Sequence, residues 1–154
     1  MASVGPFEGE SDFSVAVPRP GIYSLVFDVG GCAFALTAAD VPVAIDCTCG
    51  DVSVIESTGR LTFVVPENAE RFGIYASSQL TELVGMRVVD PEGKTKWEDM
   101  AVCGWRGYTS GRRPTSGIWQ IELMRPNVGG FEDYQVDLVG VPGYLFLSEK
   151  GYWH

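Results

Sequence analysis

The feature that most constrains the fold is a succession of short apolar or alternating runs, each closed by glycine, proline, asparagine or aspartate. In residues 118–124, for example, Trp119, Ile121 and Leu123 alternate with the polar Gln120 and Glu122, which is the period of a half-buried β-strand. No run has the length and the 3.6-residue period of a long helix. The pattern therefore predicts an all-β protein built from antiparallel strands.

About ten short strands with small connections favour a sandwich or a barrel, since nothing between them resembles a helical crossover. The candidate segments are residues 13–17, 21–29, 32–37, 43–49, 52–55, 60–65, 72–76, 84–89, 95–102, 118–124, 134–138 and 144–147. The sequence Asp90-Pro91-Glu92-Gly93 suits a tight turn and predicts a hairpin into 95–102. Residues 104–117 combine glycines, arginines and hydroxyl groups and are expected to form a long irregular loop.

Length and composition indicate one folded domain. The chain has 154 residues, of which 45% are hydrophobic and 20% charged, close to the average for globular domains. Residues 1–11 are interpreted as a cloning remnant and a linker, and residues 12–154 as a single β-sandwich domain. No apolar run reaches the roughly 20 residues that span a bilayer, and the first residues lack the pattern of a secretory signal.

The net charge of −9 restricts the partners, because an acidic surface repels nucleic acid phosphates and anionic lipid headgroups. We therefore expect neither nucleic acid nor membrane as a partner. An acidic surface is compatible with neutral polysaccharides and with cations, so structural calcium is the one candidate cofactor. Its candidate ligands lie in acidic turns at Glu92, Glu98-Asp99 and Glu132-Asp133, none of which has the spacing of a defined calcium loop.

The four cysteines, Cys32, Cys47, Cys49 and Cys103, allow three pairings if all form disulfides. Cys47 and Cys49 are two residues apart in a predicted strand, so their side chains are expected on the same face and not bridged to each other. Disulfides to distant partners and buried free thiols remain the two alternatives. Structural zinc is disfavoured, because paired C-x-x-C spacings are missing and the only histidine is His154.

Catalytic groups are sparse. A serine or cysteine nucleophile needs a base, and the only imidazole is at the chain end, where fixed geometry is least expected. No glycine-rich phosphate loop or dinucleotide fingerprint occurs. The sequence therefore predicts a protein that is not an enzyme. One catalytic alternative stays open: two of the 20 acidic residues could hydrolyse a glycosidic bond as a pair.

Three segments carry a resemblance to a known group of domains. They are Leu61-Thr62-Phe63-Val64-Val65-Pro66, Val88-Val89-Asp90-Pro91-Glu92-Gly93 and Gly117-Ile118-Trp119-Gln120-Ile121-Glu122-Leu123. This pattern, over roughly residues 60–147, resembles the jelly-roll accessory modules of secreted glycoside hydrolases and, more distantly, pre-peptidase C-terminal and P-type domains. The resemblance implies an extracellular, noncatalytic, jelly-roll-like β-sandwich. It would bind polysaccharide or oligosaccharide, or support a neighbouring catalytic domain of its parent protein.

Aromatic side chains suggest where a sugar would bind, because indole and phenol rings stack on the CH-rich face of sugars while polar groups bond the hydroxyls. Trp119 is excluded, since its alternation with apolar residues predicts a core position. The expected ligand contacts are Trp105, Tyr108, Trp97, Glu98, Arg106 and Arg112. The alternative is that the rings cover the rim or core of the sandwich and that the arginines balance nearby acids.

Overall fold

The structure is a computed structural model that describes residues 19–21, 23–24, 43–56, 58–79 and 81–147. The chain divides into two units, residues 1–34 and 35–154. In the first unit, the hydroxyl of Tyr23 donates a hydrogen bond to the carbonyl oxygen of Arg19 at 2.6 Å. The predicted strands 13–17 and 32–37, and most of 21–29, lie outside the described residues.

Ten strands are described, all in the second unit. They are β1 (Ala44–Asp46), β2 (Val52–Ile55), β3 (Gly59–Val65), β4 (Gly73–Ser78), β5 (Val84–Val89), β6 (Thr95–Val102), β7 (Arg106–Thr109), β8 (Gly117–Met124), β9 (Asp133–Val139) and β10 (Tyr144–Phe146). Within the described ranges, no helix has the length and apolar character needed to cross a bilayer.

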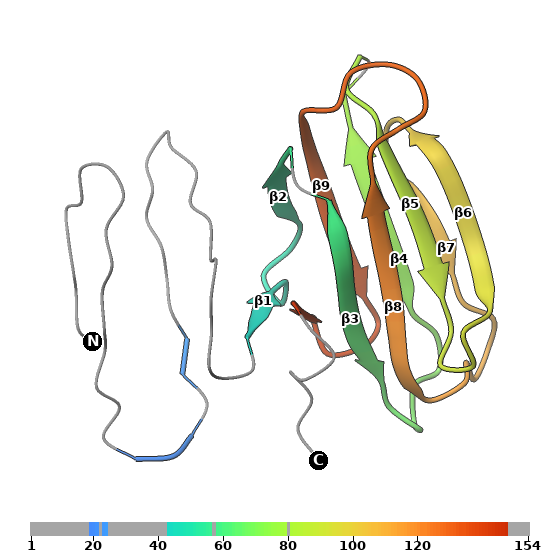
Figure 1. Ribbon diagram of the computed structural model, residues 1–154. Coiled ribbons are helices and arrows are strands. Elements are labelled where there is room, and N and C mark those ends of the chain that lie inside the picture. Colours follow the sequence, from blue (N-terminus) through green and yellow to red (C-terminus); the bar gives the residue numbers. More distant parts are fainter. Residues whose placement is uncertain (1–18, 22, 25–42, 57, 80, 148–154) are drawn as a thin grey trace. The chain divides into compact units, whose positions relative to one another are not determined.

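The strands form two antiparallel sheets (Figure 1). One has six strands in the order β1-β10-β3-β8-β5-β6, and the other has four in the order β2-β9-β4-β7. Strands β6 to β10 run back alongside β5 to β1, as in one long hairpin that is rolled into two sheets. The pairs that show this are β1·β10, β2·β9, β3·β8, β4·β7 and β5·β6. That arrangement is a jelly roll, so the predicted antiparallel, jelly-roll-like sandwich is confirmed.

The core lies between the inner faces of the sheets and is centred on aromatic side chains. Trp119 on β8 is 2% exposed, and its ring centroid lies 4.8 Å from that of Phe72 and 6.5 Å from that of Phe63. The indole N–H of Trp119 donates to the carbonyl oxygen of Thr115 at 2.8 Å, so the one polar atom of this ring is satisfied. The prediction that Trp119 is a core residue is confirmed.

The predicted hairpin after Val89 is also confirmed, because β5 pairs with β6. Asp90 fixes the turn: its carboxylate accepts the backbone N–H groups of Glu92 and Lys94 at 3.0 and 2.8 Å. The prediction of an irregular loop over 104–117 is wrong in one part, because Arg106–Thr109 form β7 and pair with β4. Tyr108 is the only large apolar side chain of this four-residue strand, so no alternation marks it.

Candidate functional site

The predicted ligand contacts fall at different ends of the sandwich. Because all strand pairs are antiparallel, the connections after even-numbered strands lie at one end and those after odd-numbered strands at the other (Figure 1). Trp105 lies in the β6–β7 connection, whereas Arg112 is exposed in the β7–β8 connection at the opposite end. The structure therefore does not place the Arg112 side chain in a common site with Trp105.

Two of the predicted aromatic contacts face the interior. Trp97 on β6 is partly buried and packs against the core. The ring of Tyr108 stacks on Trp119 with centroids 5.8 Å apart and lies equally far from Phe72. Burial raises the pKa of the Tyr108 phenol, and the charge of Asp90 adds to the effect. Neither ring is fully buried, but both contribute to packing between the sheets.

Trp105 stands at a corner that an ion pair holds in place. The guanidinium Nη1 of Arg106 on β7 lies 2.8 Å from Oδ2 of Asp99 on β6, which joins the edge strands of the two sheets. Trp105 lies in the bend directly before β7, and we infer from the alternation at Arg106 that its side chain is on the outer side of the four-stranded sheet. The N–H of Gly104 donates to the carbonyl oxygen of Ser78 at 3.0 Å, which keeps the corner against β4. The Trp105 side chain is 54% exposed.

Tyr75 on β4 is a second aromatic group on this outer side, and it is not among the ligand contacts predicted from the sequence. It pairs with Gly107 on β7 and with Asp137 on β9. Its hydroxyl forms a hydrogen bond of 2.7 Å with Oγ1 of Thr109. Its ring covers Gly73, where a β-carbon would lie only 2.7 Å from the ring atom Cζ. In the sequence, Tyr75 lies between the apolar residues Ile74 and Ala76. This alternation does not show which residues of other strands lie beside Tyr75.

The register places Trp105 and Tyr75 close together. Ala76 is opposite Arg106, and the N–H of Gly104 bonds the carbonyl oxygen of Ser78; we infer that Trp105, between these two contacts, lies opposite Ser77. Ser77 in turn pairs with Gln135 on β9. We call the outward-facing residues of this part of the four-stranded sheet the tyrosine face. They are Tyr75, Ser77, Trp105, Gln135 and Asp137.

Among the described residues, nothing forms a hydrogen bond or an ion pair with the polar side chains of Ser77, Gln135 and Asp137 on the tyrosine face. Strands β2, β4 and β9 contain no lysine or arginine, and the one cation of β7, Arg106, is paired with Asp99. Hydroxyl, amide and carboxylate groups thus lie beside two aromatic rings, and the one cation in the described strands of this sheet is already paired. This combination can stack on a sugar and bond its hydroxyls.

The outer face of the six-stranded sheet differs, because its charged groups bind one another. Glu122 on β8 accepts hydrogen bonds from Arg60 on β3 and Arg87 on β5, each at 2.8 Å. Arg87 also binds Glu98 on β6 at 2.6 Å. The predicted ligand contact Glu98 is therefore part of a ladder of alternating charges across four strands.

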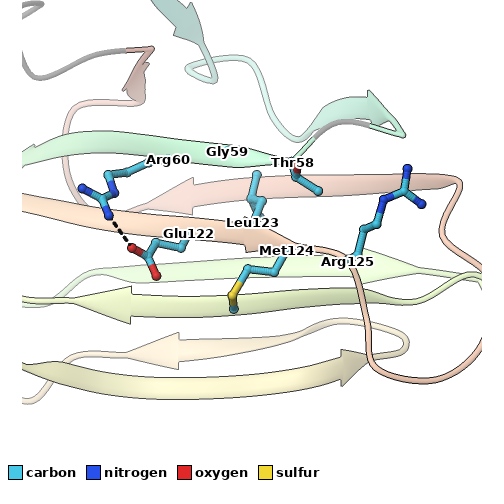
Figure 2. A pocket seen from close by; sticks show the side chains of 7 residues that line it. All are labelled: Thr58, Gly59, Arg60, Glu122, Leu123, Met124 and Arg125. Carbon is cyan, nitrogen blue, oxygen red and sulfur yellow. Dashed lines mark hydrogen bonds and ion pairs between the residues drawn. The ribbon is translucent and has the colours of Figure 1, made fainter.

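A surface hollow of about 460 Å³ adjoins this ladder (Figure 2). Its lining residues are Thr58, Gly59, Arg60, Glu122, Leu123, Met124 and Arg125. The Arg60 and Glu122 side chains in it are bound to each other, and the Arg125 guanidinium lies 5.0 Å from the centroid of the Phe131 ring. None of the predicted ligand contacts lines the hollow, so the tyrosine face remains the better candidate site.

Metal binding receives no support from side-chain clustering. Over the described residues, no three histidine, cysteine, aspartate or glutamate side chains lie close enough together to hold a metal ion. In the acidic segment expected to bind calcium, the Glu98 and Asp99 carboxylates bind arginine side chains instead.

Cys47, Cys49 and Cys103 carry free thiols, and Cys32 lies outside the described residues. The expectation that Cys47 and Cys49 share a strand face is wrong, because β1 ends at Asp46 and a turn follows. Cys47 is buried and Cys49 exposed. Burial raises the pKa of the Cys47 thiol to about 11, and the charges of Asp46 and Asp137 add to the shift.

Comparison with known proteins identifies no relative: no protein-family model, no curated protein and no solved structure matches the chain.

Proposed function

We propose that the chain is a noncatalytic, carbohydrate-binding accessory module, and that Trp105 is its principal contact with the glycan. The observation that carries the proposal is an indole 54% exposed to solvent at a corner fixed by the Arg106–Asp99 ion pair. A large ring exposed on a fixed backbone loses little conformational entropy on binding, which favours its use as a ligand platform. The jelly-roll sandwich is a rigid support for such a site.

We also propose that the module belongs to a larger extracellular protein, in which it holds a linked glycoside hydrolase near its polymer. The acidic character of the chain, with a net charge of −9, fits a neutral polysaccharide better than a polyanion. The free carboxylate and amide of Asp137 and Gln135 would bond sugar hydroxyls.

Replacing Trp105 with alanine is expected to weaken binding to the retained glycan about fivefold or more, because stacking on an aromatic ring contributes about 1–3 kcal/mol. Affinity electrophoresis and a glycan array measure this change. Tyr144→Ala is the matched control, since Tyr144 is 43% exposed but lies on the outer side of β10 in the other sheet. Unchanged binding by Trp105→Ala, or no retention of the wild type on any glycan, would count against the proposal. Release of reducing ends would favour the catalytic alternative.

A second candidate function is supported by an exposed apolar row on the six-stranded sheet. Val64 on β3 pairs with Ile118 on β8, and these side chains are 37% and 41% exposed. The β10–β3 register, in which Phe146 is opposite Thr62, brings Tyr144 beside Val64. Adjacent exposed apolar side chains of this kind are typical of protein contact surfaces. We propose this row as the surface that would pack on a neighbouring catalytic domain, whether or not the module also binds glycan.

Val64→Glu is expected to lower the thermal midpoint of the linked catalytic domain by several degrees, because a charge placed in an apolar contact weakens domain packing. The measurement is calorimetry of the parent protein, with polymer affinity recorded in parallel. The control is Val139→Glu, because Val139 is 42% exposed on β9 in the other sheet. Equal midpoints for the two variants would rule out this row as the contact surface.

A further inference from the structure

We propose that the glycan site extends from Trp105 across Ser77 and Tyr75 to Gln135 and Asp137, so that the ligand is an extended chain of neutral sugars. This inference rests on the proposed function and adds to it the length and charge of the ligand. Its basis is the tyrosine face, on which residues from β4, β7 and β9 lie side by side.

The Tyr75 ring is held in one position. Its hydroxyl is bound to Thr109 at 2.7 Å, two residues beyond Gly107 on the neighbouring strand. The ring lies over Gly73 in space that a side chain at that position would fill, since a β-carbon there would be 2.6 Å from the Tyr75 hydroxyl oxygen. The register partners of Gly73 are Thr109 on β7 and Val139 on β9, so the ring lies between these two positions. The ring is therefore fixed by the strand beneath it and by the Thr109 hydroxyl.

The second step is the separation of the two rings. Trp105 lies opposite Ser77, and Tyr75 is two residues from Ser77 on the same strand. Tyr75 and Trp105 are thus diagonal neighbours, whose Cα atoms in antiparallel sheets are about 7–8 Å apart, and the Tyr75 ring lies farther from Trp105 because it leans over Gly73 toward Thr109. Rings at that separation on one face contact different sugar units. A chain that covers both must hold at least two connected sugars.

The third step is the direction of the chain. Two rows of paired residues cross the sheet toward β9. One runs from Trp105 through Ser77 to Gln135, and the other runs from Gly107 through Tyr75 to Asp137. In the described part of the molecule the Gln135 and Asp137 side chains form no hydrogen bond or ion pair with another residue. The glycan would run across the strands from β7 to β9 with its hydroxyl groups facing the amide and the carboxylate.

The fourth step is the charge of the ligand. Asp137 is a carboxylate on a face without lysine or arginine in its strands β2, β4 and β9, and Arg106 at its edge is neutralised by Asp99. Burying an acidic sugar against an unpaired carboxylate is unfavourable. The face therefore selects neutral sugars over uronic acids and sulfated sugars.

The experiment is titration calorimetry with cello-, xylo- and manno-oligosaccharides of two to six units, and with oligogalacturonides as acidic probes. For the neutral series that the wild type binds, we expect affinity to rise with length. Tyr75→Ala should bind the six-unit chain about tenfold more weakly and the two-unit chain almost unchanged. Tyr75→Phe, which keeps the ring, should retain most of the affinity, and Asp137→Asn should improve binding of oligogalacturonides.

The results of these titrations distinguish a failure of the extended site from a failure of the glycan-binding function. If Trp105→Ala loses binding while Tyr75→Ala binds the six-unit chain like the wild type, the extended site is wrong and the glycan-binding function stands. Affinity independent of chain length, or a preference for oligogalacturonides, also overturns the inference. If the wild type binds no probe and no glycan on an array, the function itself fails. Circular dichroism of Tyr75→Ala confirms its fold, and Tyr144→Ala again serves as the exposed aromatic control.

Discussion

Replacing Trp119 with alanine is expected to lower the free energy of unfolding by about 3–5 kcal/mol. The indole is 2% exposed and contacts the rings of Phe63, Phe72 and Tyr108, which come from both sheets. Its removal leaves a cavity where the sheets meet, and it leaves the carbonyl of Thr115 without its donor. Since domains of this size are stable by about 5–15 kcal/mol, the variant should be marginally folded at best.

Urea unfolding followed by circular dichroism measures the effect of Trp119→Ala. Trp105→Ala is the matched control, because it removes an identical side chain that is 54% exposed, and its free energy of unfolding should stay within about 0.5 kcal/mol of the wild type. Similar unfolding midpoints for the two variants would show that Trp119 is not central to the core.

Local sequence patterns were sufficient for much of the fold. Alternation identified β8 around Trp119, because a half-buried strand repeats every two residues irrespective of its partners. The turn at Asp90 was predictable for a similar reason: proline and glycine fix the backbone, and the aspartate side chain bonds its own turn. Such features depend on neighbours within a few residues, so one sequence reveals them.

The candidate site could be predicted only in part, because it depends on partners far apart in the chain. Trp105 was selected for its residue type and its surroundings. Tyr75 was not, since its importance follows from pairing with Gly107 and Asp137, which lie on two other strands. Strand register is set by the packing of the whole sheet, and no spacing within β4 encodes it.

Proximity in sequence was also misleading. Arg112 is seven positions after Trp105, and both are predicted ligand contacts in a segment that is expected to be an irregular loop. That segment contains β7, which carries the chain from one end of the sandwich to the other. A four-residue strand spans about 13 Å, enough to separate two side chains that a flexible loop could bring together. The wrong prediction of a loop at β7 and the wrong placement of Arg112 beside Trp105 therefore have the same cause, which is that β7 lacks an alternating sequence pattern.

Gly107→Ala should be the most disruptive small change on the tyrosine face. A β-carbon at this position would overlap the carbonyl oxygen of Ile74 and lie 2.6 Å from Cα of Tyr75, both backbone atoms of the paired strand β4. Backbone cannot move aside as a flexible side chain does, so β7 must separate from β4. We expect a loss of about 3 kcal/mol or more in unfolding free energy, measured by urea unfolding.

The same substitution should impair glycan binding even where the protein remains folded, because β7 positions both Trp105 and the Thr109 hydroxyl that binds Tyr75. Gly111→Ala is the matched control: a β-carbon there meets nothing within 4 Å, so stability and glycan affinity should remain at wild-type values. Equal stability of the two variants would mean that β7 does not approach β4 this closely. A destabilised Gly107→Ala with unchanged glycan affinity would instead separate the β4–β7 contact from the binding site.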